Sequence, residues 1–248
     1  MSAFSIFVAT PSLRAMVNAP YVKSLIALQA RCHRLGIGFA FDMVCGISVI
    51  DHARNYLASH FLANSTHSHL LFIDDDMGFN ADEIAAMFAW PEVEVIAAMC
   101  PKRRIDWERI KQVVLAHPDI EASHLANLTG NYGGMFHLPE AAAQMSVGPK
   151  PMPVDAIGTG IMLISRACLL RLIEVAPLHP VNAKSEGFPL YPFFRCEMVD
   201  GVLTGEDVAF CNLVRKHGGR ILGAPWPVIT HSGPYDFIGD LCGIAHYV

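Results

Sequence analysis

The chain alternates short apolar runs with longer segments whose apolar residues recur at helical spacing. In the first hundred residues the apolar runs predict strands, and the segments between them predict helices. The expected strands are residues 5–10, 37–44, 69–73 and 93–99, and the expected helices are residues 18–35, 51–64 and 80–89. Strands that alternate with helices form mainly parallel sheets covered on both faces, so the pattern predicts an α/β fold.

Beyond Pro101 the alternation becomes irregular. Residues 101–152 hold a basic run and a glycine-rich turn, and the aromatic and proline content of residues 177–203 is typical of a loop over a cleft. Further strands are expected at residues 155–165 and 220–224, and further helices up to residue 174 and at residues 206–217. No repeat or linker divides the sequence. We therefore expect a single domain, residues 1–248, with a regular half (1–100) and an irregular half (101–248).

Composition limits the class of protein. Of the 248 residues, 52% are apolar and 17% charged, which favours a large core, a homodimer interface or peripheral contact with a membrane. The net charge of −5 gives no reason to expect binding to unmodified nucleic acid. No apolar run approaches the ~18 residues of a membrane span, and the first residues lack the basic region of a signal peptide. Seven scattered cysteines without a Cys-x-x-Cys pair fit a reducing, cytoplasmic location.

Three consecutive carboxylates, Asp74, Asp75 and Asp76, follow directly after the predicted strand at residues 69–73. The carboxyl ends of strands in α/β proteins are where ligands bind. Because clustered carboxylates repel one another, a hard divalent cation such as Mg²⁺ or Mn²⁺ is their natural partner. The alternative is a solvated acidic turn that caps the following helix.

Arg54 lies in the first turn of the predicted helix 51–64, for which Asp51 is the expected N-cap. Free backbone N–H groups at a helix start favour an anion, and a guanidinium adds a fork suited to phosphate. An ordinary surface arginine is the alternative. The Gly158-Thr159-Gly160 stretch does not extend to G-x-G-x-x-G, so it indicates close approach of a backbone or ligand and not a dinucleotide site.

Two motifs in the second half carry candidate chemistry. Glu206 and Asp207 open a predicted helix, where one carboxylate can act as a general base, although Thr204 with Asp207 also matches a helix-capping pattern. His231 follows the last predicted strand and is either a metal ligand or a structural histidine. Aromatic residues on both sides of the acidic pair are candidates for stacking on a sugar or for core packing; they are Tyr191, Phe193, Phe194, Trp226 and Tyr235.

Taken in order, these motifs resemble those of glycosyltransferases of the GT-A fold, close to the family-2-like group. Arg54 at a helix start precedes an Asp-x-Asp motif at residues 74–76, and the Gly-Thr-Gly strand, the Glu206-Asp207 pair and His231 follow, over roughly residues 4–235. The resemblance implies a Rossmann-like GT-A domain with a nucleotide-sugar-binding half (1–100) and an acceptor-binding half (101–248). It also implies transfer of a hexosyl-type sugar from a UDP- or GDP-sugar to a hydroxyl of a glycan, lipid or other acceptor.

The resemblance assigns the donor and ion contacts as follows. Asp76 and His231 would be ligands of Mn²⁺ or Mg²⁺, while Asp74 would contact the ribose or sugar. Three adjacent aspartates leave open which two oxygens face the ion, so Asp74 is also a candidate metal ligand and Asp75 a candidate donor contact. Further donor contacts are expected at Thr10 and Pro11 for the base or ribose, Arg54 for the phosphates or sugar, and Lys102 for added positive charge.

For the transfer step, Asp207 would be the catalytic base of an inverting enzyme, and Glu206 would bind or orient the acceptor. A retaining enzyme would leave Asp207 without that role, and we favour inversion. A metal-dependent phosphohydrolase or phosphotransferase also places Asp-x-Asp after a strand, but that class usually has Thr or Val where this chain has Gly78. A non-catalytic nucleotide-sugar or glycan-binding module is the other alternative, and it would not need both Asp207 and His231.

Overall fold

The computed structural model describes residues 4–128, 132, 136–138, 147–181, 186–199 and 201–247. The strands in this part of the chain are β1 (Ser5–Ser12), β2 (Gly38–Cys45), β3 (His69–Ile73), β4 (Met77–Phe79), β5 (Val95–Ala98), β6 (Phe136–His137), β7 (Met152–Pro153), β8 (Ala156–Ile157), β9 (Ile161–Ser165), β10 (Glu197–Val199), β11 (Val202–Thr204), β12 (Ile221–Ala224), β13 (Ile229–His231) and β14 (Phe237–Gly239). The helices are α1 (Ala19–Arg34), α2 (Ile50–Asn64), α3 (Ala81–Ala86), α4 (Trp107–Ala116), α5 (Ala122–Leu128), α6 (Arg166–Val175), α8 (Glu206–Lys216) and α9 (Leu241–Ile244), with 3₁₀ turns at Met87–Ala89 and Ala245–Tyr247.

Within the described residues, the central sheet has seven strands in the order β2-β1-β3-β9-β5-β12-β7. β1 runs parallel to β2 and β3, and β5 runs parallel to β12. β9 is antiparallel to both of its neighbours, and β7 is antiparallel to β12. The predicted α/β fold with a mainly parallel central sheet is therefore confirmed. The two reversed strands were not predicted, because hydrophobic periodicity does not encode strand direction.

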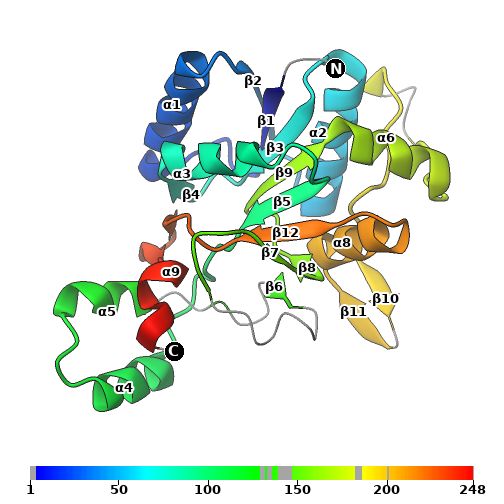
Figure 1. The fold of residues 1–248 in the computed structure, drawn as a ribbon. Coiled ribbons are helices and arrows are strands. Elements are labelled where there is room, and N and C mark those ends of the chain that lie inside the picture. Colours follow the sequence, from blue (N-terminus) through cyan, green and yellow to red (C-terminus); the bar gives the residue numbers. More distant parts are fainter. Residues whose placement is uncertain are drawn as a thin grey trace.

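Helices cover both faces of this sheet (Figure 1). One apolar cluster joins α2, α6 and α8 to the face carrying Leu70 and Phe72. A second cluster joins α1 and α3 to the opposite face, which carries Leu71 and Ile73. β3 is consequently buried on both sides, which explains why residues 70–73 are all apolar and do not alternate with polar residues. Among the described residues, no helix combines the length and apolar character needed to cross a membrane.

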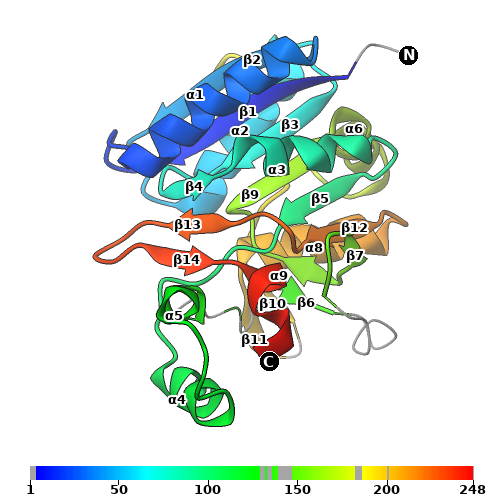
Figure 2. The same cartoon turned by 60° about the vertical axis from the view of Figure 1, so that its left-hand side comes forward.

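A second, antiparallel sheet of three strands, β14-β13-β4, lies beyond the carboxyl end of β3 (Figure 2). Its register pairs His231 with Met77 and Thr230 with Gly78. A Cβ atom on Gly78 would lie 2.6 Å from Cβ of Pro20, so this strand needs glycine where the start of α1 packs on it. The sequence did not predict this three-stranded sheet. The sheet places the Asp74–Asp76 turn beside the end of β13.

Several local expectations were wrong. α4 and α5 occupy the stretch expected to be irregular, and the hairpin β10–β11 overlaps the end of the expected loop 177–203. These elements are short. The start of α4 is stabilised by a local cap, because the Asp106 carboxylate accepts the N–H of Arg109. Most of the glycine-rich turn at residues 130–134 lies outside the described residues.

The predicted helix caps were partly right. Asn80, the first residue of the expected helix 80–89, is the N-cap of α3 and accepts the N–H of Asp82 at 2.8 Å. Asp51 is not the N-cap of α2, because the helix begins one residue earlier, after Val49. Thr204 is likewise no cap for α8, which follows Gly205 without a side-chain hydrogen bond at its start. The expected cap from Thr204 is therefore absent at the start of α8 in the described residues.

His69, the first residue of β3, makes a testable contribution to stability. It is buried, and burial lowers its pKa to about 4, although a hydrogen bond involving the backbone of Pro91 opposes the shift. The unfolded chain binds this proton with a pKa near ~6.5, so native stability falls as pH drops from ~6.5 towards ~4. At pH ~5 we expect a loss of about 2 kcal/mol in the free energy of unfolding.

Urea unfolding of His69→Leu at pH ~7.5 and ~5 checks this contribution. The difference between the two free energies should be about 2 kcal/mol smaller in His69→Leu than in the wild type. His33→Asn, at an exposed histidine of α1, should keep the wild-type difference. An unchanged pH dependence in His69→Leu would show that this imidazole does not resist protonation.

Candidate functional site

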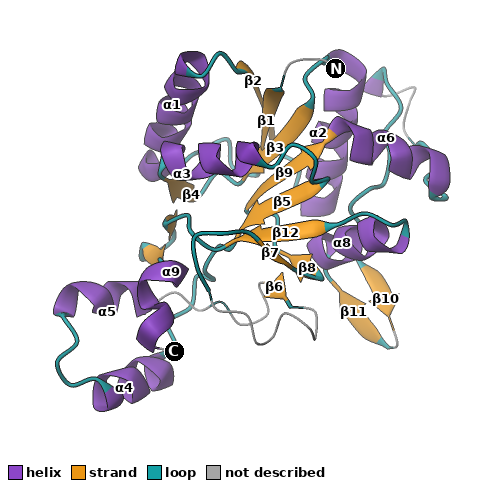
Figure 3. Ribbon diagram, viewed as in Figure 1, coloured by secondary structure: helices purple, strands orange, loops and turns teal. Residues whose placement is uncertain are grey.

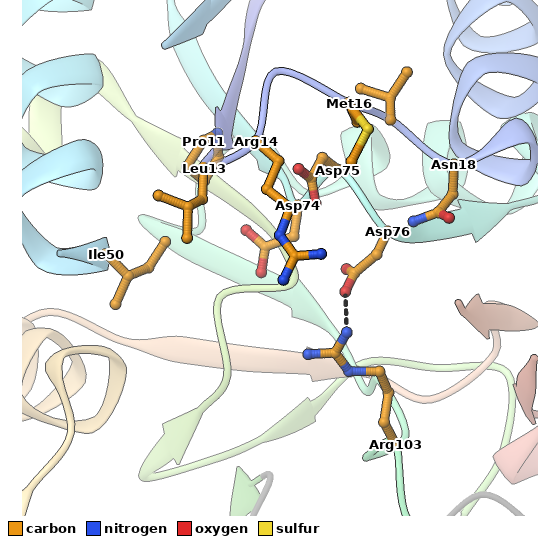
Figure 4. A pocket seen from close by; sticks show the side chains of 11 residues that line it. Pro11, Leu13, Arg14, Met16, Asn18, Ile50, Asp74, Asp75, Asp76 and Arg103 are labelled. Carbon is orange, nitrogen blue, oxygen red and sulfur yellow. Dashed lines mark ion pairs between the residues drawn. The ribbon is translucent and has the colours of Figure 1, made fainter. Parts of the chain in front are cut away.

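A cavity of about 610 Å³ opens at the carboxyl ends of β1 and β3 (Figure 4). All three carboxylates of the Asp74–Asp76 turn line it, as the sequence predicted for the end of this strand. The other lining residues are Pro11, Leu13, Arg14, Met16, Val17, Asn18, Ile50 and Arg103. The cavity therefore combines an acidic floor with two guanidinium groups and several apolar side chains.

Asp76 and His231, which are far apart in the sequence, meet at this site. Nε2 of His231 lies 3.3 Å from Oδ2 of Asp76, and Nδ1 lies 2.7 Å from the carbonyl oxygen of Pro101. The backbone N–H of Ser232 also donates to the Asp76 carbonyl at 2.8 Å. Because a carbonyl can only accept, Nδ1 carries a hydrogen, which makes Nε2 of the neutral ring an acceptor that faces a carboxylate. Two acceptors at this distance require a proton or a cation between them.

Arg103 is the basic residue of the 102–104 run that reaches the site. Its Nη1 lies 3.1 Å from Oδ2 of Asp76 (Figure 4). The same oxygen faces Nε2 of His231. The expected contact was Lys102, which is not among the residues that line this cavity. The basic run was visible in the sequence. Which of its side chains points into the cavity depends on the path of the chain after β5.

Arg54 is buried, with 4% of its surface exposed, so the alternative of a surface arginine is wrong. Its guanidinium forms two hydrogen bonds to Asp74, at 3.0 and 3.1 Å, and an ion pair with Glu206 at 3.4 Å. The predicted contact with phosphate stays a prediction, and the partners present here are carboxylates. Arg54 thus ties the start of α2 to the end of β3 and the start of α8.

Burial and mutual charge perturb this acidic cluster. Burial raises the pKa of Asp74, Asp75 and Glu206 above the usual carboxyl range, and Arg54 counteracts the shift for Asp74 and Glu206. For Arg54 itself, burial lowers the pKa, but the two partner carboxylates outweigh burial and the net shift is upward. Burial thus disfavours the ionised form of these carboxylates. A cation bound beside them would stabilise the ionised form.

Glu206 and Asp207 are placed differently by the structure. Glu206 forms an ion pair with Arg54. Asp207 does not line the cavity, and among the hydrogen bonds of the described residues it accepts only the backbone N–H of Val208, at 2.7 Å. No ion pair holds Asp207 in that part of the chain. Of the acidic pair, Glu206 is therefore held by a guanidinium, whereas Asp207 has no such partner among the described residues.

Two further predicted contacts have local explanations. Thr10 is fully buried and its hydroxyl lies 2.7 Å from that of Tyr21, so of the Thr10-Pro11 pair only Pro11 lines the cavity. Gly160 confirms the expected close approach. Its carbonyl accepts the N–H of Asp74 at 2.9 Å, and a Cβ atom there would lie 2.7 Å from Cε of Met77. The approaching groups belong to the protein itself.

The aromatic candidates divide between core and surface. Phe193 and Phe194 are buried in the core beside α2 and α8, so the core-packing alternative holds for them. Tyr191 packs against the same cluster, and the indole N–H of Trp226 donates to the carbonyl oxygen of Glu83 at 2.9 Å. Tyr235 is 48% exposed, which makes it the candidate most accessible to a ligand.

Asp76 and His231 are compatible with a divalent ion that a ligand helps to bind. Bonds of ~2.1 Å to each donor at a right angle would separate the two donor atoms by ~3.0 Å, close to the 3.3 Å between Oδ2 and Nε2. Among the described residues, no three His, Cys, Asp or Glu side chains converge as a metal-binding group. An ion here would need oxygens from a ligand, which is how Mg²⁺ and Mn²⁺ bind with nucleotide phosphates.

Comparison with known proteins leaves the family open. No family model matches the chain. ATP-binding cassette sub-family G member 5 of Rattus norvegicus is 26% identical over 142 residues, which is 54% of this chain and 22% of that protein. The chain thus spans about a fifth of the length of this relative, and nothing about that protein's activity is transferred.

Solved structures resemble the chain only loosely. A197 from STIV has a TM-score of 0.48 at 13% identity, covering 96% of this chain and 95% of that one. TarS of S. aureus has a TM-score of 0.41 at 10% identity, covering 98% and 62%. A glycosyltransferase involved in glycosylation of the major capsid of PBCV-1 has a TM-score of 0.33 at 12% identity, covering 70% and 68%. These similarities are too weak to carry an argument about function, which must come from the site itself.

Proposed function

We propose that the chain is a glycosyltransferase that moves a sugar from a nucleotide-diphosphate donor to an acceptor hydroxyl with inversion. The observation that carries the proposal is the pairing of Asp76 with His231 at 3.3 Å, at a cavity beyond the carboxyl end of β3. The folding of β3 does not by itself require a histidine from the end of β13 beside the acidic turn. Such a histidine fits a site for a divalent cation that accompanies a diphosphate.

Asp76 and His231 would hold the Mn²⁺ or Mg²⁺ ion, which would act as a Lewis acid on the charge that develops on the leaving diphosphate. The hydrogen bond from His231 Nδ1 to Pro101 fixes the ring with Nε2 towards Asp76. Asp74 would contact the ribose or sugar while Arg54 keeps its carboxylate oriented. Pro11 and the apolar lining residues Leu13 and Ile50 offer a surface for the nucleoside.

The base of this reaction would be Asp207. The acceptor oxygen forms a bond to the anomeric carbon as the bond to the diphosphate oxygen breaks, and the hydroxyl proton passes to the carboxylate. Asp207 suits that role better than Glu206, because the Arg54 guanidinium already occupies Glu206. Glu206 would instead hold Arg54 and the start of α8 in place beside the acceptor.

The acceptor and the location of the protein are further parts of the proposal. Exposed apolar side chains on the cavity wall, including Leu13, Met16 and Ile50, suit an acceptor or donor with apolar surface. A lipid acceptor would fit peripheral contact with a membrane from the cytoplasm, and a glycan acceptor would not require it. A homodimer remains compatible with the apolar composition of the chain.

The test is a panel of UDP-, GDP-, dTDP- and CMP-sugars screened with and without Mn²⁺ for an increase in melting temperature. At least one nucleoside-diphosphate sugar should stabilise the protein only when Mn²⁺ is present, and product analysis with candidate acceptors should then detect sugar transfer. Release of phosphate from phosphomonoesters without sugar transfer would indicate a phosphohydrolase. Mn²⁺-dependent donor binding without turnover on any acceptor class would indicate a binding module.

A further inference from the structure

We propose that Arg103 is a latch on the ion site: it neutralises Asp76 when no ion is bound, and it moves to the donor diphosphate when ion and nucleotide bind together. The inference rests on the proposed function, because it assumes that Asp76 and His231 hold a divalent cation. It adds that the ion and the nucleotide bind cooperatively and names the residue that couples them.

The first observation is that the guanidinium and the proposed ion compete for one atom. Oδ2 of Asp76 lies 3.1 Å from Nη1 of Arg103 and 3.3 Å from Nε2 of His231. A divalent cation held by that oxygen and that nitrogen would bring its charge directly beside the guanidinium. Two cationic groups repel at such a distance, so binding of the ion requires Arg103 to leave Oδ2.

The second observation is that Arg103 is free to leave. Its side chain is 51% exposed and follows the end of β5, whereas the Arg54 side chain is 5% exposed and held by two carboxylates. The Arg103 stem runs past Gly233, where a Cβ atom would lie 3.0 Å from Cδ of Arg103. A rotation of this side chain would break its ion pair with Asp76, whose side chain is 15% exposed, and would move its stem away from Gly233.

The third observation is that the displaced guanidinium has a destination. Arg103 lines the same cavity as the Asp74–Asp76 turn, so a diphosphate bound beside the ion would lie within its reach (Figure 4). A guanidinium matches two phosphate oxygens at once, and such a two-point contact is stronger than an ion pair with a single carboxylate oxygen. Binding of the ion alone leaves Arg103 without an anion, and the diphosphate supplies one. The two ligands should therefore increase each other's affinity.

The variant that tests the latch is Arg103→Gln, which keeps a polar side chain and removes the charge. Mn²⁺ alone is titrated by the electron paramagnetic resonance signal of the free ion, and UDP, GDP and dTDP are titrated calorimetrically with and without Mn²⁺. Without the competing guanidinium, Mn²⁺ alone should bind about two- to fivefold more tightly. Nucleotide binding in the presence of Mn²⁺ should become about tenfold weaker, because the diphosphate loses its partner.

Two control variants sharpen this test. Arg104→Gln removes the neighbouring charge, which is exposed and does not line the cavity, and should leave both affinities unchanged. Arg103→Lys retains the charge and should retain most of the coupling between Mn²⁺ and nucleotide. Equal urea midpoints for all variants would show that the affinities are compared between folded proteins.

The outcomes separate the latch from the proposed function. If the wild type binds Mn²⁺ and Asp76→Asn loses that binding, while Arg103→Gln leaves the coupling unchanged, the latch is refuted and the ion site stands. If Arg103→Gln weakens Mn²⁺ binding in the absence of nucleotide, Arg103 supports the ion site and does not compete with the ion, which also refutes the latch. If the wild type binds no Mn²⁺ even with nucleotide, the proposed function fails and the latch fails with it.

Discussion

Asp76→Asn is expected to lower Mn²⁺-dependent affinity for the nucleotide by about 100-fold or more, because loss of even a residue behind a metal ligand costs ~10–100-fold. The substitution keeps the shape of the side chain but removes the anionic oxygen that faces both His231 and Arg103. The imidazole of His231 is then the only one of the two proposed ion ligands that remains. Calorimetric titration of UDP and GDP at fixed Mn²⁺, together with circular dichroism, measures the loss in a folded protein.

Asp75→Asn is the matched control for this prediction. Asp75 lines the same cavity and neighbours Asp76 in the chain, but among the described residues no ion pair or hydrogen bond links it to His231. We expect a loss of nucleotide affinity at least tenfold smaller than that of Asp76→Asn, roughly the difference between a direct and an indirect contribution. Unchanged Mn²⁺-dependent affinity in Asp76→Asn would contradict the assignment of the ion site.

Asp207→Asn is expected to lower the rate of sugar transfer by about a thousandfold while it leaves donor affinity nearly unchanged, since general base catalysis contributes ~10²–10⁴-fold. The amide cannot take the proton of the acceptor hydroxyl, and Asp207 makes none of the contacts that hold the Asp74–Asp76 turn. Steady-state rates with the donor and acceptor identified by the panel, beside calorimetric donor titration, separate the two effects.

Glu206→Gln is the informative comparison, because it weakens the contact with Arg54 at 3.4 Å and leaves Asp207 intact. We expect lower stability and a higher KM for the acceptor, with a smaller loss of kcat than in Asp207→Asn. The reverse ranking of the two kcat values would assign the base to Glu206. Near-normal transfer by both variants, with retention at the anomeric carbon seen by nuclear magnetic resonance, would replace inversion by retention.

Much of the fold and part of the site followed from local sequence. The limits of β3 were predicted as found, because a mostly apolar run that ends in three acids marks a strand buried on both faces. Arg54 was expected to contact the phosphates or sugar of a donor, and its carboxylate partners in the structure were not predicted. Its guanidinium meets Asp74 and Glu206 only because α2, β3 and α8 converge on one edge of the sheet.

The sequence alone determined the α/β class, the burial of β3 and the position of the Asp74–Asp76 turn at its carboxyl end. These depend on hydrophobic period and on residues adjacent in the chain, so they are encoded locally. Only the tertiary structure decided that Arg103 and not Lys102 reaches Asp76, and that Glu206 and Asp207 have different partners. It also brought His231 to Asp76 through the pairing of β13 with β4. Such contacts depend on strand order and on the path of connecting segments, which residues distant in the sequence determine together.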